Sequence, residues 1–301
     1  MKKIAVLLFV LIVAGTASLA QMGSGMRDVL TPLEYSRQRS SEEMRISRGG
    51  QLYDDWWRTT VDTVKPDRDH PLWKKQNKNK RGGYDTYRCK ECHGWDYRGR
   101  DGAYGKGSHY TGFTGIYEAS RKMSEKELEA VLKGSAGKEH DFTGLLGNED
   151  IADLALFMKK GIIDMTGLID VEGVPAAGNT EAGRAIFVKS CMHMCHGGNG
   201  TAINFGDSEK PEFIGTVAGE NPWEFVHKVR AGQPGTRMRS AIINKWSDAD
   251  IRDLLSYART LPSAPPEPGL FSRLRRSMGF GMGHHDWFIP EDSRGFGPII
   301  D

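Results

Sequence analysis

The four cysteines of this 301-residue chain all lie in two short motifs, each of which ends in a histidine. The first motif reads C-K-E-C-H, so that Cys89 and Cys92 are three residues apart and His93 follows directly. This is the attachment signature of c-type haem. Two thiols one helical turn apart can each form a thioether with a haem vinyl group, and the adjacent histidine then lies under the iron. We therefore expect Cys89 and Cys92 to hold a haem covalently and His93 to be its proximal ligand.

The second motif reads C-M-H-M-C-H and has one residue more between its cysteines, Cys191 and Cys195, before His196. We expect the extra residue to be looped out, so that Cys195 and His196 keep the same relative position as the second cysteine and the histidine of the usual motif. Two disulfides or a zinc site are the alternatives, but zinc favours repeated C-x-x-C or H-x-x-x-H pairs. A disulfide has no need of a histidine after each second cysteine. The motifs therefore predict two covalently bound haem c groups with iron, and they leave no thiol for a cysteine nucleophile.

The first 20 residues have the features of a secretory signal peptide. Two lysines precede an apolar run over residues 4–14, and small residues precede Gln21, which predicts cleavage after Ala20. The run is shorter than the ~20 residues that a spanning helix needs, and no later run is as long. We therefore expect an exported protein with no membrane span in its mature chain. Covalent haem attachment in bacteria also occurs outside the cytoplasmic membrane, so the periplasm is the expected location and the extracellular space is the alternative.

Charge gives no support to nucleic-acid binding. The chain has 41 Lys and Arg against 39 Asp and Glu, and loss of Lys2 and Lys3 with the signal peptide makes the two numbers equal. Between residues 61 and 87 lies an insertion with several lysines, which could steer an acidic redox partner. We favour the reading of this insertion as a solvated loop, because charge runs are usually solvated.

Each motif is followed by the same two-helix pattern, so the chain contains an internal repeat. After the first motif, a capping box at Ser124 opens a helix that ends at Gly134. After the second motif, Asn221 and a proline open a matching helix that ends at Gly232.

The last helix of each unit carries a shared D-I-x-D-L core. It is predicted over residues 149–158, capped by Asn148, and over residues 248–257, capped by Ser247. The apolar face of each last helix should pack on the first helix of its unit, which in the first unit is expected to begin at Ser47.

Each unit thus resembles a class I cytochrome c domain, with an N-terminal helix, a haem motif, an intervening helix, a ligand loop and a C-terminal helix. The resemblance implies a mainly α fold of two tandem cytochrome c-like helical domains around covalent haems. The expected organisation is a signal peptide at 1–20, an irregular N-terminal arm at 21–46, the first domain at 47–163, a linker at 164–179, the second domain at 180–261, and a Pro-rich linker with an aromatic tail at 262–301.

In that family the sixth iron ligand comes from the loop before the last helix and is usually methionine. Met238 lies six residues beyond Gly232, whereas His140 lies six residues beyond Gly134. The resemblance therefore implies Met238 as ligand of the second haem and, in a departure from the family pattern, His140 as ligand of the first. His109, in a glycine-rich loop, is the competitor for the first iron.

Other histidines are assigned to the surface or to haem packing, and they include His70 and His227. Thioether sulfur favours reduced iron, whereas two imidazoles leave the potential lower. The two haems should therefore differ in potential.

These features favour an electron carrier between exported redox partners over a substrate-converting enzyme, because no residue needs to act as a general acid or base. One alternative is a di-haem oxidoreductase with a catalytic first haem, similar to thiosulfate dehydrogenases or di-haem peroxidases. Another is an electron-transfer subunit that self-associates or joins a larger multi-haem assembly through the arm and the tail.

Overall fold

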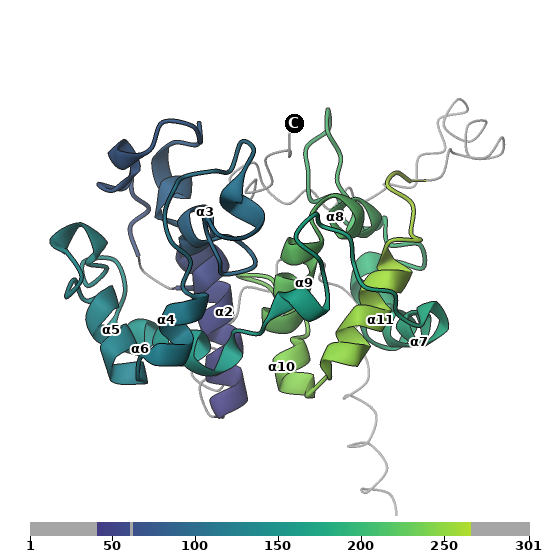
Figure 1. The fold of residues 1–301 in the computed structure, drawn as a ribbon. Coiled ribbons are helices and arrows are strands. Elements are labelled where there is room, and N and C mark those ends of the chain that lie inside the picture. Colours follow the sequence, from purple (N-terminus) through teal and green to yellow (C-terminus); the bar gives the residue numbers. More distant parts are fainter. Residues whose placement is uncertain (1–40, 61–62, 266–301) are drawn as a thin grey trace, which may run out of the picture.

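The computed structural model describes residues 41–60 and 63–265 (Figure 1). The predicted signal peptide, most of the predicted arm and the aromatic tail lie outside the described residues. Within the described residues the chain forms helices and loops, with isolated β-bridges and no strand. The expected mainly α, cytochrome c-like fold is therefore confirmed. None of the helices in this part of the chain is both long and apolar enough to cross a membrane.

The first unit lies on the left of Figure 1 and is organised around the long helix α2. Its elements, in chain order, are α2 (Glu42–Thr59), η1 (Trp73–Lys75), η2 (Gly83–Tyr87), α3 (Cys89–His93), η3 (Ala103–Gly105), α4 (Tyr117–Lys122), α5 (Glu125–Leu132), η4 (Lys138–His140), α6 (Asn148–Leu156), η5 (Phe157–Gly161) and η6 (Met165–Gly167).

The second unit repeats this order without the segment that separates α2 from α3. Its elements are α7 (Thr180–Phe187), η7 (Val188–His196), α8 (Ile214–Glu220), α9 (Pro222–Ala231), α10 (Ala241–Asn244) and α11 (Asp248–Ala258). Gly134 follows α5 and Gly232 follows α9, and both have a φ angle of 87°. L side chains rarely adopt this conformation, so glycine suits both positions. Gly232 is the C-cap of α9, and Gly134 directly follows the C-cap of α5, Lys133.

The first helix begins earlier than the sequence predicts. We expected an irregular arm up to residue 46, but α2 starts at Glu42 and the hydroxyl oxygen of Ser41 accepts a hydrogen bond from the N–H of Met44 at 3.2 Å. Glu42 and Glu43 lie in the first turn, where negative charge is favourable. The prediction missed a serine cap followed by two acidic residues, and the last five residues of the predicted arm are helical.

Local capping signals set most of the other helix starts. The capping box at Ser124 and the caps at Asn221 and Ser247 are confirmed, and Ser247 also forms a capping box with Asp250. The predicted cap at Asn148 is wrong by one residue: Asn148 is the first residue of α6, and the N–H of Gly147 donates to the Asp150 carboxylate at 3.0 Å.

The first and last helices of each unit cross at a glycine, in the same way in both units. A Cβ atom on Gly49 of α2 would lie 2.1 Å from the carbonyl oxygen of Asp153 in α6, and one on Gly183 of α7 would lie 1.9 Å from that of Asp253 in α11. Each of these aspartates is the second Asp of the shared D-I-x-D-L core. The predicted packing of the last helix on the first is therefore confirmed, and both units use the same contact.

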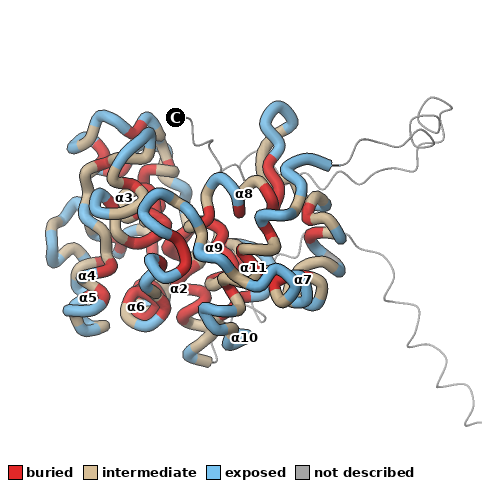
Figure 2. The backbone as a smooth tube through the Cα atoms, turned by 45° about the vertical axis from the view of Figure 1, so that its right-hand side comes forward, coloured by how far each residue is buried: buried red, intermediate tan, exposed pale blue. Residues whose placement is uncertain are grey.

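The two units share one continuous core. Helix α2 packs on α6 of its own unit and also on α9 and α10 of the second unit. The Ser47 hydroxyl of α2 donates to the carbonyl oxygen of Ala231 in α9 at 2.8 Å. Figure 2 shows that the buried segments of α2 and α9 lie in the middle of the molecule. Helix α2 thus supports the haem motif of the first unit and joins it to the second.

Candidate haem sites

The first motif forms the short helix α3, which places its two thiols one turn apart. Gly94 ends this helix with a φ angle of 77°, and its N–H donates to the carbonyl oxygen of Lys90, four residues back, at 2.9 Å. All four cysteines of the chain are free thiols. Burial raises the pKa of Cys89 to about 12 and also raises that of Cys92, so both thiols are neutral at pH 7. Their environment does not favour a reactive thiolate.

The orientation of His93 is fixed by a backbone hydrogen bond. Its Nδ1 atom lies 2.7 Å from the carbonyl oxygen of Thr114, so Nδ1–H donates and Nε2 keeps its lone pair. Burial, with a further contribution from His140, lowers the pKa of His93 to about 4. The imidazole is therefore neutral at pH 7 and is held in the tautomer that a metal ligand needs.

His140 lies beside His93 with its ring nearly perpendicular to it. The ring centroids are 6.3 Å apart and the planes meet at 77°. The Nδ1 atom of His140 lies 3.4 Å from the carbonyl oxygen of Val131, which leaves Nε2 unpaired by this contact, and burial lowers the pKa. Metal–imidazole bonds are about 2 Å long, and each ring centre lies roughly 1 Å behind its nitrogen, so two imidazoles on one ion have centroids about 6 Å apart. The spacing of these two rings fits an iron between them.

His109 has different neighbours. Its ring stacks on Tyr104, with centroids 4.7 Å apart, and its Nδ1 lies 4.0 Å from the carboxylate of Glu91. Glu91 is fully buried and forms ion pairs with Arg81 and Lys90. The structure therefore brings His140, and not His109, into ring contact with His93.

The second motif absorbs its additional residue in a π-helix. We expected that residue to be looped out, but residues Val188–His196 form the π-helix η7. The N–H of Gly197 donates to the carbonyl oxygen of Met192, five residues back, at 3.0 Å, where the first motif has a bond to the fourth residue back. Gly197 has a φ angle of 70°, close to that of Gly94. One inserted residue in a helix produces such a π-turn, so His196 keeps its place before the terminal glycine.

The candidate proximal histidine of the second unit is buried. His196 is 9% exposed, and its Nδ1 atom has no hydrogen-bond partner among the described residues. Burial lowers its pKa to about 4, and its ring lies 5.9 Å from that of Phe205. Burial also raises the pKa of Cys191 to about 11, whereas Cys195 is exposed.

Met238 lies in the loop between α9 and α10. Its side chain is half-buried and packs against the core, and its N–H donates to the Thr236 hydroxyl at 3.2 Å. This loop corresponds to the one that carries His140 in the first unit. The described residues contain no cluster of three or more His, Cys, Asp or Glu that could hold a metal ion by themselves.

Sequence reasoning did not identify the residues that join the two units. His227 of α9 was assigned to the surface or to haem packing, but it is fully buried at the contact with α2. Its Nε2–H donates to the carbonyl oxygen of Gly50 at 3.0 Å, and its Nδ1 accepts from the Tyr97 hydroxyl at 2.9 Å. Tyr97 follows the first motif closely, so His227 links the second unit to the surroundings of the first haem site.

Asp54 of α2 is the centre of a buried ion-pair network at the same contact. One of its carboxylate oxygens accepts from Arg88, directly before the first motif, and the other accepts from Lys228 of α9, each at 2.5 Å. Burial alone would raise the pKa of Asp54, but Lys228 and Arg88 outweigh it and hold the pKa well below its usual range. One carboxylate thus neutralises a cation from each unit.

Comparison with known proteins gives one match. Residues 178–257 match the family model described as cytochrome C oxidase, cbb3-type, subunit III. The match supports a c-type cytochrome. A cytochrome c domain transfers electrons through a haem group, and the matched residues contain the second motif and Met238. No curated protein and no solved structure matched the chain.

Proposed function

We propose that this protein is an exported di-haem c-type cytochrome, which transfers electrons between redox protein partners through two covalent haems of different potential. The periplasm is the proposed location, because the predicted signal peptide precedes a domain of a haem-attaching type. The observation that carries the proposal is the pair His93 and His140, whose neutral rings lie 6.3 Å apart in a unit outside the matched residues.

In the first unit, Cys89 and Cys92 would hold the haem, and His93 and His140 would bind its iron. When bound, the haem supplies one-electron redox chemistry. The protein orients the two imidazoles through the carbonyl oxygens of Thr114 and Val131 and keeps both rings neutral. Two histidines bound to the iron would leave no open position for a substrate, and this supports a carrier over an oxidoreductase with a catalytic first haem.

In the second unit, Cys191 and Cys195 would hold the haem, and His196 and Met238 would be its ligands. Methionine stabilises ferrous iron and raises the potential relative to bis-histidine coordination. The second haem is therefore proposed to have the higher potential. Spectroelectrochemical titration would give two transitions, and a single transition for two equivalent haems would contradict this part of the proposal.

The spin state of each haem tests the proposed function. Both haems of the oxidised protein should be low-spin by electron paramagnetic resonance. His140→Ala should make one haem high-spin and able to bind cyanide, because the sixth position opens, and His109→Ala is the matched control that should change neither property. If the wild-type protein already has a high-spin haem that binds cyanide and His140→Ala changes nothing, the carrier proposal fails and a catalytic first haem gains support.

A further inference from the structure

The segment between α2 and the first motif has no counterpart in the second unit. There, α7 ends at Phe187 and η7 begins at the next residue. In the first unit, residues 63–87 contain η1 and η2 and form a cover with buried side chains of its own, while the lysines of the charge run stay exposed to solvent. Trp73 is 5% exposed, and its Nε1–H donates to the carbonyl oxygen of Arg81 at 2.9 Å, while buried Asn79 exchanges hydrogen bonds with Gln76.

This cover lies against the candidate site of the first haem. Buried His70 stacks on Phe142 with centroids 5.7 Å apart. Phe142 in turn contacts the ring of His140, with centroids 5.2 Å apart, and His140 faces His93. A chain of ring contacts therefore connects the cover to the proposed sixth ligand.

The outer surface of the cover carries four exposed lysines, Lys74, Lys75, Lys78 and Lys80, which we name the lysine patch. No acidic side chain among the described residues forms an ion pair with any of them. The Lys80 ammonium donates only to a backbone carbonyl, that of Asn77, at 2.7 Å. The Lys78 ammonium lies 4.8 Å from the centroid of the Tyr110 ring, a contact that does not neutralise its charge. The positive charge of the patch is thus available to an external anion.

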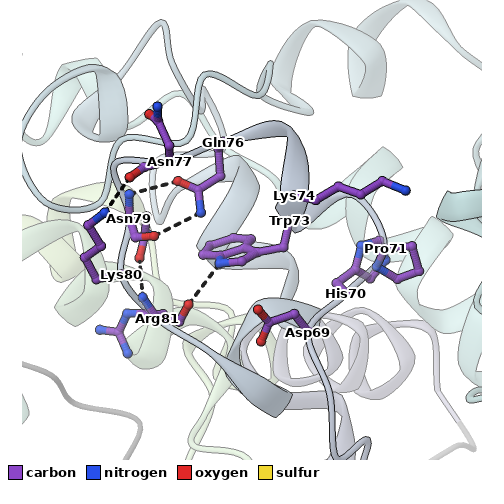
Figure 3. A pocket seen from close by; sticks show the side chains of 10 residues that line it. All are labelled: Asp69, His70, Pro71, Trp73, Lys74, Gln76, Asn77, Asn79, Lys80 and Arg81. Atoms are coloured by element: carbon purple, nitrogen blue, oxygen red, sulfur yellow. Dashed lines mark hydrogen bonds between the residues drawn. The ribbon is translucent and has the colours of Figure 1, made fainter.

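Two lysines of the patch, Lys74 and Lys80, line a surface hollow of about 520 Å³ together with Arg81 and one carboxylate, that of Asp69. The Asp69 carboxylate accepts a hydrogen bond from the N–H of Gly83. Figure 3 shows Lys80 at one end of the hollow and Lys74 at the other, with the Trp73 ring between them. Side-chain amides also line the hollow, from Gln76, Asn77 and Asn79. The amides of Gln76 and Asn79 donate to carbonyl oxygens of the protein, those of Asn79 and His109. The exposed amide of Asn77 can donate a hydrogen bond to a carboxylate that the lysines attract.

We propose that the lysine patch is the docking surface for an acidic redox protein, so that electrons enter or leave the chain at the first haem. This proposal rests on the proposed function. It adds the type of partner and the site at which electrons enter or leave the protein. A protein is favoured over an anionic membrane, because the surface exposes lysines and the amide of Asn77 and keeps Trp73 buried, whereas amphipathic membrane-binding surfaces expose apolar groups. In such a transfer the reduced partner would lose one electron and the iron held by the first unit would gain it, with no bond made or broken.

Electron transfer from a plant-type ferredoxin tests the docking surface. This acidic protein has a potential near −400 mV, low enough to reduce c-type haems. The variant Lys74→Glu/Lys75→Glu reverses two exposed charges that form no ion pair with any of the described residues. Lys126→Glu/Lys210→Glu is the matched control, because it makes the same change of net charge at exposed positions in α5 and in the second unit. Stopped-flow absorbance of the full-length haem-loaded protein gives the second-order rate of haem reduction.

At low ionic strength the patch variant should be reduced about tenfold more slowly than the wild type, since steering changes association rates by at least that factor. The difference should disappear near 1 M salt, where the Debye length falls to about 3 Å. The control should stay within about twofold of the wild type. Equal rates in the patch variant and the control overturn the proposal, as does a wild-type rate that does not rise when salt is lowered.

Two further measurements distinguish a failure of the docking-surface proposal from a failure of the proposed di-haem function. Dithionite reduction, together with a mass that corresponds to two haems, shows whether the di-haem carrier itself is correct; an intact carrier with an unaffected patch variant refutes the docking surface alone. Sedimentation with phosphatidylglycerol vesicles tests the membrane. Binding that the wild type shows and the patch variant loses would overturn the protein partner in favour of a lipid surface.

Discussion

Replacement of Asp54 by asparagine should destabilise both units together. The change keeps the shape of the side chain and removes the charge that Arg88 and Lys228 share. All three side chains are buried, with 1%, 4% and 9% of their surfaces exposed. Without the carboxylate, both buried cations lose their shortest ion pair and keep more distant ones, Arg88 with Asp85 at 3.5 Å and Lys228 with Glu224 at 3.8 Å. Removal of one partner of a buried ion pair typically costs about 3–5 kcal/mol.

A loss of this size predicts a large change in Tm. In a chain of this length, a loss of 1 kcal/mol in the free energy of unfolding lowers Tm by roughly 2–4 °C. The Tm of the variant should therefore fall by about 10 °C. Thermal unfolding followed by far-UV circular dichroism and by Soret absorbance measures the backbone and the haem sites separately. Because Asp54 joins α2 to α9, both signals should shift by the same amount. Asp101→Asn is the control, since that side chain is 73% exposed.

The pH dependence of the effect follows from the pKa of Asp54. Because this pKa is lowered in the folded state, the charged carboxylate stabilises the fold at every pH above its unfolded value of about 4. The stabilisation is lost as pH falls from that value towards the folded pKa. The difference in Tm between wild type and Asp54→Asn should therefore be constant from pH 8 to about pH 5 and should shrink below about pH 4. A shift at pH 7 no larger than that of the control would refute the reasoning.

Three other outcomes are expected. Intact mass spectrometry of the protein matured with haem-attachment machinery should give a chain that begins at Gln21 and carries two haems, and the mass of one haem would exclude the second motif as an attachment site. Met238→Ala should remove the methionine-to-iron charge-transfer band and lower one of the two potentials, whereas an unchanged band would place the ligand elsewhere. Gly183→Ala should lower the free energy of unfolding by about 1–3 kcal/mol, because its Cβ would lie 1.9 Å from the Asp253 carbonyl oxygen. The control Gly219→Ala has open space around it and should be neutral or slightly stabilising, and equal effects in chemical denaturation would disprove the crossing contact.

Local signals explain where sequence reasoning was accurate. The caps at Ser124, Asn221 and Ser247 act within one helical turn, so neighbouring residues are sufficient to predict them. The start of α2 was missed because the serine cap at Ser41 lies in a polar stretch whose apolar periodicity is weak. The shared D-I-x-D-L core predicted the packing of each last helix on its first helix, because its apolar face has the period of a helix.

The extra residue of the second motif shows the limit of such reasoning. Spacing alone is compatible with a looped-out residue or with a π-turn that keeps all residues in the helix. The backbone of η7 adopts the second solution because the helix continues directly from α7, without the break that precedes α3 in the first unit. A continuous helix retains its backbone hydrogen bonds, and a loop would lose some of them.

By itself, the sequence determined the positions that could attach haem, the repeat that contains them and the local ends of most helices, since all of these depend on spacing within a few residues. Only the tertiary structure decided that His140 and not His109 lies beside His93, because that choice depends on how the loop after α5 packs against a motif 47 positions earlier in the sequence. It also decided that Asp54 and His227 join the units. A buried charge and a buried imidazole are stable there because partners from distant segments neutralise the one and hydrogen-bond the other.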